Sequence, residues 1–363
     1  MPNNLTVRAV RGVGVEVPTN YVLGTSRGAF SKACLVLVDL ETDAGIIGRS
    51  YIFGHSVEVS RAIVAMLAAV DRIAKGDPVA PLDLYAKLHE RFALIGVQGI
   101  IRMALAGFDV AAWDVLAIAQ NLPLARLLGA TPRPIRAYNS CGLGLMAAPE
   151  QVADEAEKLL GGNFRAVKLR LGYPTLKQDI AAVRAVKKRI GDATLMTDYN
   201  QALSLTDALE RGRALDGEGI YWLEEPIRHD DYAGSATLRG ELKVPVQIGE
   251  NFSLPEGMQV ALDAGASDWV MPDLERIGGV TGFMRAAALA QARRIEMSSH
   301  LYPEVSAHLL AATPTAHWLE YVDWMDQLVQ EPLRIVDGCA VVADRPGNGL
   351  AWDAKAVEKY RVA

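Results

Sequence analysis

Four acidic residues recur at a nearly constant interval along this chain of 363 residues. Asp198, Glu224, Glu250 and Asp273 are separated by 26, 26 and 23 residues, and His300 follows 27 residues later. Each acid ends a short apolar run that reads as a β-strand. One interval can hold a strand, a helix and their loops, and in a closed parallel β/α barrel all strands end at one face. We therefore expect these five side chains to converge on one site.

The same alternation predicts the domains. Strand-like runs alternate with helical stretches near 135–139, 164–170, 194–198, 220–224, 245–249, 268–272, 295–299 and 317–320. This pattern indicates a modified (β/α)₈ barrel over residues 131–330. Residues 1–130 read as strands followed by helices, typical of an α+β domain, and a stretch at about 19–32 looks like a mobile loop that could serve as a substrate lid. Residues 331–363 are expected to pack back on the first domain. The predicted fold class is α/β, a TIM-type barrel with an N-terminal α+β capping domain.

Composition and charge exclude several classes of partner. Apolar residues make up 50 % and charged residues 22 % of the chain, which is ordinary for a globular enzyme. A net charge of −6 gives no reason to expect nucleic acid or an anionic membrane as partner. Cys34, Cys141 and Cys339 lie far apart and read as free thiols in a reducing compartment. With no apolar signal core at the N-terminus, we expect a cytoplasmic protein.

Asp198, Glu224 and Glu250 are candidate metal ligands. Carboxylates suit Mg²⁺ better than Zn²⁺, which prefers nitrogen and sulfur ligands. One acid after a strand is more often a helix cap than a ligand. Three in phase are harder to explain as caps, and a cation would relieve their mutual repulsion. Alternation lets only one of Glu224 and Glu225 point inward, and the shared interval favours Glu224.

Lys168 and Arg170 lie two residues apart on the preceding strand and would share its inner face. Cations at the mouth of the barrel could bind a substrate carboxylate or move a proton. Arg170 would then depress the pKa of Lys168. The alternative is a pair that merely balances the acids.

Asp273 and His300 form a candidate acid–base pair. A carboxylate bonded to one imidazole nitrogen fixes the tautomer and leaves the other nitrogen as general base. Glu320 ends the last predicted strand. If protonated, Glu320 could donate a hydrogen bond to a developing oxyanion, and otherwise it would form a simple salt bridge. Among the other histidines, His55 is the one that could belong to the site.

These residues stand in motifs that resemble the enolase superfamily and, within it, the mandelate racemase subgroup. The matching segments are Leu35–Leu40, Ile101–Ala104, Phe164–Lys168, Asp198–Gln201, Glu224–Pro226, Gly249–Asn251, Ile277–Gly282, Ser298–Leu301 and Ala311–Glu320. The resemblance covers nearly the whole chain. It implies a capping domain over a modified barrel, often assembled as a homo-octamer, with a small carboxylate as substrate.

The resemblance also implies roles for individual residues. Removal of the proton α to a carboxylate would be the common step, through an enediolate stabilised by Mg²⁺; enolase-superfamily sites are themselves a standard example of this use of Mg²⁺. The implied roles are Mg²⁺ binding by Asp198, Glu224 and Glu250, proton abstraction by His300 with Asp273, substrate-carboxylate contacts from Lys168 and Glu320, and nearby positions for Ser140 and Asn200.

One position departs from the pattern of the racemases. There the strand motif is Lys-x-Lys and its second lysine is the base on the opposite face, whereas this chain has Arg170. Arginine keeps its proton at neutral pH and is a poor general base. We therefore favour dehydration of an acid sugar, with His300 as base and then acid. A mandelate-type racemase and a non-catalytic anion-binding protein are the alternatives.

The predicted lid gives a second hint about the substrate. It carries Ser26, Arg27 and Lys32, and His55 stands in a neighbouring segment. These side chains would suit a polyhydroxylated or anionic substrate better than a phenyl group. The alternative is that some of them point to solvent.

Overall fold

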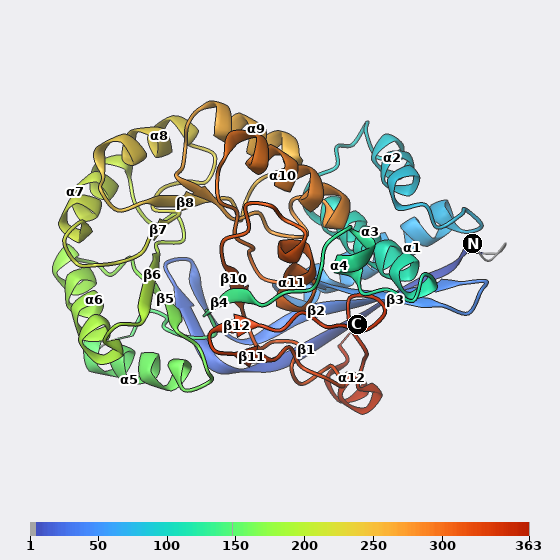
Figure 1. Ribbon diagram of the computed structural model, residues 1–363, viewed down its shortest axis with the longest axis horizontal. Coiled ribbons are helices and arrows are strands. Elements are labelled where there is room, and N and C mark those ends of the chain that lie inside the picture. Colours follow the sequence, from blue (N-terminus) through green and yellow to red (C-terminus); the bar gives the residue numbers. More distant parts are fainter. Residues whose placement is uncertain (1–4, 147, 363) are drawn as a thin grey trace.

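The computed structural model describes residues 5–146 and 148–362 (Figure 1). Its N-terminal part is an antiparallel sheet in the order β1-β2-β3, packed against helices. The elements of this part are β1 (Val7–Thr25), β2 (Gly28–Thr42), β3 (Ile47–Phe53), α1 (Val57–Ala74), α2 (Pro81–Arg91), α3 (Gly99–Ala119) and α4 (Leu124–Leu127). The apolar faces of the sheet and of α1 and α3 bury one core between them.

The second part is a barrel of parallel strands with helices outside (Figure 1). Its elements are β4 (Ile135–Asn139), α5 (Pro149–Leu160), β5 (Ala166–Arg170), α6 (Leu176–Ile190), β6 (Thr194–Asp198), α7 (Leu205–Leu215), β7 (Leu223–Glu224), α8 (Tyr232–Glu241), β8 (Val246–Ile248), α9 (Leu254–Asp263), β9 (Trp269–Val270), α10 (Gly279–Arg293), α11 (Pro303–Ala311) and β10 (Leu319–Tyr321). β10 pairs with β4, and isolated bridges of Met297 with Val270 and Ala316 close the ring. The run expected near 295–299 thus contributes bridges in place of a regular strand. The predicted capped α/β barrel is confirmed.

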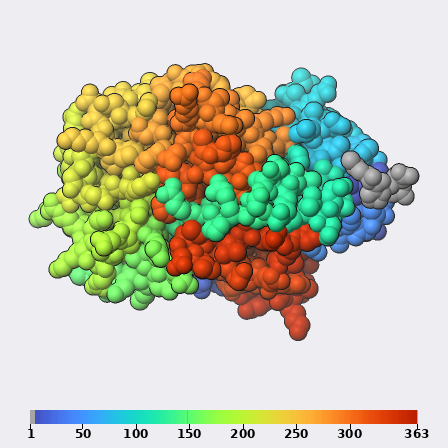
Figure 2. Space-filling model, in the orientation of Figure 1, coloured from blue at the N-terminus to red at the C-terminus, as the bar shows by residue number. Residues whose placement is uncertain are grey.

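The C-terminal segment contacts both parts. It contains β11 (Ile335–Val336), β12 (Cys339–Ala340) and α12 (Ala354–Tyr360). β12 pairs antiparallel with β4, whereas α12 lies against β1. In Figure 2, the segment around residue 130 crosses the visible face beside this C-terminal chain. The exact domain limits stay a prediction. Within the described ranges, no helix is long and apolar enough to cross a membrane.

The stretch expected to be a mobile lid loop is a β-hairpin. β1 and β2 continue through it, with Leu23 opposite Phe30 and Thr25 opposite Gly28, so that only Ser26 and Arg27 remain as the turn. The hairpin reaches from the capping sheet to the mouth of the barrel (Figure 1). The prediction of a loop was wrong because the strand pairing, after an irregularity between Pro18 and Leu23, resumes at Leu23 and continues to the turn.

The inner face of the barrel is built in two layers. Side chains of alternate strand residues point inward. A buried, mainly aromatic floor is formed by Tyr138, Ala166, Met196, Trp222 and Trp318. Two residues further along each strand come Ser140, Lys168, Asp198, Glu224 and Glu320. The floor therefore supports the charged layer directly above it.

Asp109 of α3 joins the capping part to the barrel. Its carboxylate accepts hydrogen bonds from the backbone N–H and the hydroxyl of Thr281 in the first turn of α10, at 2.9 and 2.6 Å. Gly279 has φ of 73°, and a Cβ there would lie 2.5 Å from Asp109 Oδ2. Glycine is thus required both by the left-handed backbone and by the close approach of the carboxylate.

The stability of the fold should depend on pH through Asp109. Burial raises the pKa of Asp109 to about 7, although the bonds from Thr281 lower it. In the unfolded chain the group loses its proton near pH 4. Its contribution to stability is therefore fully present below about pH 4 and is lost as the pH rises toward 7. Urea unfolding at several pH values should show a slope that differs by about one proton between the wild type and Asp109→Asn. Parallel curves for the two proteins would contradict this.

Candidate active site

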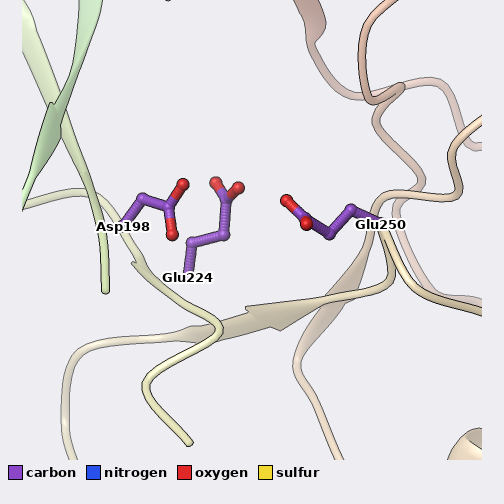
Figure 3. A group of neighbouring side chains, drawn as sticks. All are labelled: Asp198, Glu224 and Glu250. Carbon is purple, nitrogen blue, oxygen red and sulfur yellow. The ribbon is translucent and has the colours of Figure 1, made fainter. Parts of the chain in front are cut away.

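Three carboxylates converge above the floor of the barrel. Asp198 ends β6, Glu224 ends β7 and Glu250 follows β8, and ligand oxygens of the three lie within 4.8 Å of one another. Figure 3 shows their carboxylates turned toward a common space. Gly249 has φ of 142°, and a Cβ there would lie 2.8 Å from the backbone nitrogen of Met271, so the turn into Glu250 depends on glycine.

The electrostatics of this group fit a hard cation. Asp198 and Glu224 are 1 % and 0 % exposed. Burial raises the pKa of Glu224 to about 8, and the neighbouring acids Asp198, Glu320 and Glu250 add to the effect, although Lys168 lowers it. Buried carboxylates that face one another are unfavourable without compensation, and an oxygen-only donor set suits Mg²⁺. Asp198, Glu224 and Glu250 therefore form the candidate metal site.

Lys168 lies among the acids. Its Nζ is 2.7 Å from Glu224, 2.8 Å from Glu320 and 3.4 Å from Asp198. Burial by itself lowers the pKa of Lys168, but Glu224 and Glu320 outweigh burial and the pKa is raised well above its usual range. The expectation that Arg170 depresses this pKa was wrong because the three acids are the groups that Lys168 contacts.

Arg170 is bound to the loop that follows β4. Its Nη1 donates to the carbonyl oxygens of Ser140 and Gly142 at 3.0 and 2.7 Å, and its Nη2 donates to Ser140 Oγ at 2.7 Å. Only 4 % of Arg170 is exposed. The side chain lies on the inner face as expected, but its guanidinium is held by protein oxygens.

His300 and Asp273 form the pair expected from their spacing. His300 Nδ1 lies 2.7 Å from Asp273 Oδ2, and His300 Nε2 lies 3.2 Å from Glu250 and 3.7 Å from Glu320. The Asp273 carboxylate also accepts the backbone N–H groups of Glu275 and Arg276, which fix its orientation. Burial lowers the pKa of His300, but Glu250 and Glu320 outweigh burial and raise the pKa well above its usual range.

Glu320 accepts hydrogen bonds at both of its carboxylate oxygens. Its Oε1 accepts from Ser140 Oγ at 2.6 Å and from Lys168 at 2.8 Å, and its Oε2 accepts from the backbone N–H of Leu301 at 3.0 Å. Burial raises the pKa of Glu320, but Lys168 and His300 outweigh burial and lower it to about 2. In this arrangement Glu320 accepts from its neighbours, which corresponds to the salt bridge that the sequence left as the alternative to a protonated donor.

The lid hairpin is fastened to the loop that follows Asp198. Arg27 donates from Nε to the carbonyl of Asn200 at 3.2 Å and from Nη2 to that of Gln201 at 2.6 Å. Asn200 in turn donates to both oxygens of Asp198, at 2.7 and 2.9 Å. Lys32 pairs instead with Glu16 at 2.6 Å on the exposed surface. The lid's polar groups thus mainly bind protein, and the inference of a polyhydroxylated substrate loses this support.

Removing the contact between Arg27 and the barrel should release the lid. In Arg27→Ala the hairpin loses two charge-assisted hydrogen bonds, and we expect proteolytic cleavage within residues 19–32 to be about tenfold faster. Lys32→Ala is the matched control, because it removes a cation of the same hairpin that contacts only Glu16 among the acids. Equal cleavage rates in Arg27→Ala and the control would show that the contact does not hold the lid.

The site opens into a cavity of about 260 Å³ lined by both polar and aromatic side chains. The polar ones include Arg27, Arg276 and His55, whose ring centroid lies 4.1 Å from that of Phe53. Burial lowers the pKa of His55 to about 4, so it is neutral at pH 7. Phe30, Phe53 and Trp324 form an aromatic wall of the cavity, with the Trp324 ring centroid 5.7 Å from that of Phe30 and 4.7 Å from that of Phe53. Ser140 does not line this cavity and is fully buried behind it.

The sequence reasoning missed several of the cavity residues. Arg276, which donates to the backbone oxygen of Glu250 at 3.0 Å, follows Asp273 by three residues and could have been found from that spacing. The aromatic wall had no such signal, because Phe30, Phe53 and Trp324 come from the hairpin, from β3 and from beyond β10.

Comparison with known proteins identifies the family. Residues 8–129 match the mandelate racemase / muconate lactonizing enzyme N-terminal domain, and residues 151–356 match the enolase C-terminal domain-like family. The chain belongs to the enolase superfamily, in its mandelate racemase and muconate lactonizing enzyme subgroup. The L-talarate/galactarate dehydratase of Salmonella typhimurium is 30 % identical over 347 residues, which cover 92 % of this chain and 84 % of that protein.

Two solved structures are similar over essentially the whole chain. An enolase from the alphaproteobacterium BAL199, with bound magnesium, has a TM-score of 0.96 at 42 % identity and covers 98 % of this chain and 99 % of its own. An enolase from Bradyrhizobium, complexed with magnesium and mandelic acid, has a TM-score of 0.95 at 36 % identity and covers 100 % of both chains. Magnesium is thus bound in close structural relatives of this protein.

Proposed function

We propose that this protein is a magnesium-dependent enzyme that removes the α-proton of a 2-hydroxycarboxylate, with His300 as the base. We further propose that its overall reaction is dehydration of an acid sugar. The observation that carries the proposal is the Asp273–His300 pair: Asp273 orients the imidazole through Nδ1, Nε2 lies 3.2 Å from the metal-site acid Glu250, and His300 lines the cavity. The similarity to the L-talarate/galactarate dehydratase of Salmonella typhimurium supports dehydration as the overall reaction.

The three acids and His300 would have separate roles in the proposed reaction. Asp198, Glu224 and Glu250 would hold Mg²⁺, which when bound stabilises negative charge developing on the substrate carboxylate. His300 Nε2 takes the α-proton, and the C–H electron pair forms a double bond to the β-carbon as the β-carbon–oxygen bond breaks. The imidazolium returns its proton to the departing hydroxide, which leaves as water. The resulting enol becomes a 2-keto-3-deoxy acid.

The hydrogen bonds of Arg170 favour a reaction in which His300 is the only base. A guanidinium is a poor base, and that of Arg170 donates to the carbonyl oxygens of Ser140 and Gly142, so we do not assign it as a base on the face opposite His300. Elimination needs one group that acts first as base and then as acid, whereas racemisation between two bases needs a second. This difference favours elimination.

A second candidate is a mandelate-type reaction on an aryl 2-hydroxy acid. The aromatic wall of Phe30, Phe53 and Trp324 favours it, because aromatic rings pack well against a flat apolar group. The Bradyrhizobium relative complexed with mandelic acid supports the same reading. Racemisation would then need a second base; Lys168 is the remaining candidate, and its raised pKa counts against that role.

One screen separates the candidates. The Mg²⁺-loaded enzyme should be incubated in D₂O with aldonates, aldarates and both mandelate enantiomers, while 2-keto acid formation and α-deuteration are followed. We expect a 2-keto acid from at least one acid sugar and no interconversion of mandelates. Interconversion of mandelates with no 2-keto acid would refute dehydration. Absence of α-proton exchange with any carboxylate would favour a non-catalytic anion-binding protein. Homo-octamer assembly and cytoplasmic location stay predictions.

A further inference from the structure

Arg276 differs from the other arginines that line the cavity in having unused donors. Arg27 donates from Nε and Nη2 to backbone carbonyls, and Arg170 donates from both terminal nitrogens to the loop after β4. Arg276 donates from Nη1 to the backbone oxygen of Glu250 at 3.0 Å. Among the described residues, none accepts a hydrogen bond from its Nε or Nη2, and neither nitrogen is fully buried. Since Arg276 lines the cavity, these donors are available to a ligand.

The charge of Arg276 also lacks a close carboxylate. Its side chain is 19 % exposed, and in the described part of the chain its ion pair is with Glu250, at 3.7 Å. Glu250 is a candidate metal ligand, so its charge would be shared with Mg²⁺. The adjacent acid Glu275 directs Oε2 to the backbone N–H of Phe53 at 3.2 Å. A mostly buried guanidinium with free donors points to an anionic ligand, because it can hold a carboxylate through two parallel N–H groups.

Glu250 places Arg276 close to the reacting end of the site. Its Oε1 lies 3.7 Å from Arg276 Nη1, and its Oε2 lies 3.2 Å from His300 Nε2. Arg276 and His300 thus contact different oxygens of one carboxylate. A substrate group bound by Arg276 would therefore stand a few bonds from the carbon whose proton His300 removes.

We propose that Arg276 binds a second carboxylate of the substrate, so that the enzyme acts on sugar diacids (aldarates) in preference to monoacids (aldonates). The inference rests on the proposed function and names its substrate class. The first carboxylate would lie at the metal site, and the second would accept the free N–H groups of Arg276. A monoacid would leave these donors unpaired, which disfavours its binding.

Two ligands that differ by one carboxylate test the inference. 2-Hydroxyisobutyrate and citramalate are both 2-hydroxy-2-methylcarboxylates with no proton on the hydroxyl-bearing carbon, and citramalate carries a second carboxylate. In calorimetry at saturating Mg²⁺, we expect the wild type to bind one enantiomer of citramalate about 10- to 100-fold more tightly than 2-hydroxyisobutyrate, as for a charge-assisted contact. Equal affinities of the wild type for the two ligands would overturn the proposal.

Substitution of Arg276 should remove this preference. Arg276→Gln keeps a donor for the Glu250 backbone oxygen but loses the charge, and we expect it to bind the two ligands with affinities within about threefold of each other. Its affinities for 2-hydroxyisobutyrate and for Mg²⁺ should stay within about threefold of the wild type. Arg276→Lys keeps the charge and should retain part of the preference. An unchanged preference in Arg276→Gln, or an equal loss for both ligands, would overturn the proposal.

Arg102→Met is the matched control for a general effect of charge. Arg102 lies near enough to Arg276 for the two charges to repel, but it donates to Ser253 Oγ and does not line the cavity. We expect this variant to keep the wild-type preference for citramalate. A loss as large as that in Arg276→Gln would show that the preference needs no contact and would overturn the proposal.

Failure of the proposed function can be told apart from failure of this inference, because the binding experiment does not depend on turnover. A wild type that exchanges no α-proton with any carboxylate, yet shows a preference for citramalate that depends on Arg276, would refute the function and support the diacid site. A wild type that exchanges the α-proton of acid sugars but lacks the preference would support the function and overturn the role of Arg276.

Discussion

Replacing His300 with asparagine should abolish proton abstraction: we expect exchange of the substrate α-proton with D₂O to fall by about 10⁴-fold. Asparagine has no group that can take the proton, whereas the imidazole is oriented by Asp273 at 2.7 Å and lines the cavity. Proton NMR of the substrate in D₂O measures the exchange directly, without knowledge of the final product. Exchange retained for one enantiomer would reveal a second base, with Lys168 as the candidate.

His308→Asn is the matched control for this variant. His308 is buried like His300, but it lies in α11, accepts the backbone N–H of Ala125 at 3.2 Å and does not line the cavity. We expect the variant to be less stable and to retain exchange within about threefold. Equal losses in both histidine variants would point to disturbed packing instead of a missing base.

Loss of Mg²⁺ should have the second large effect. Treatment with EDTA should abolish α-proton exchange, and Asp198→Asn should weaken Mg²⁺ affinity by at least about 100-fold, since even groups that only support metal ligands are worth 10- to 100-fold. Asp198 is the informative position because it contacts neither His300 nor Glu320. Calorimetric Mg²⁺ titration of the apoprotein, with restoration of activity by added Mg²⁺, measures both effects.

Glu304→Gln is the control for the metal variant. Glu304 is a buried acid of α11 that accepts from the hydroxyl of Tyr51 at 2.6 Å and lies outside the three-carboxylate group. Its replacement should leave Mg²⁺ affinity within about threefold. Exchange that survives EDTA, or Mg²⁺ affinity unchanged in Asp198→Asn, would contradict the assignment of the metal site.

The parts of the site that the sequence predicted lie along single strands. Alternation placed Lys168 and Arg170 on the inner face, and the interval near 25 residues placed Asp198, Glu224 and Glu250 at neighbouring strand ends. Both are local properties, because the period of a strand and the length of a βα unit do not depend on distant packing.

The parts that the sequence did not predict depend on contacts between distant segments. The extent of the lid hairpin is decided by cross-strand pairing, and the Phe30–Trp324 contact joins residues from opposite ends of the chain. The hydrogen bonds that Glu320 accepts come from Ser140, Lys168 and Leu301, which belong to three different segments. No periodicity records such contacts.

The sequence by itself determined the barrel, the family, the candidate metal ligands and the spacing of His300 from Asp273. Only the tertiary structure decided what each charged side chain binds. Arg170, which the sequence could describe only as a poor base, is held by the loop after β4, where it donates to the carbonyl oxygen and the hydroxyl of Ser140. The physical reason is that spacing fixes the face and depth of a side chain in the barrel, whereas its hydrogen-bond partners come from neighbouring strands and loops.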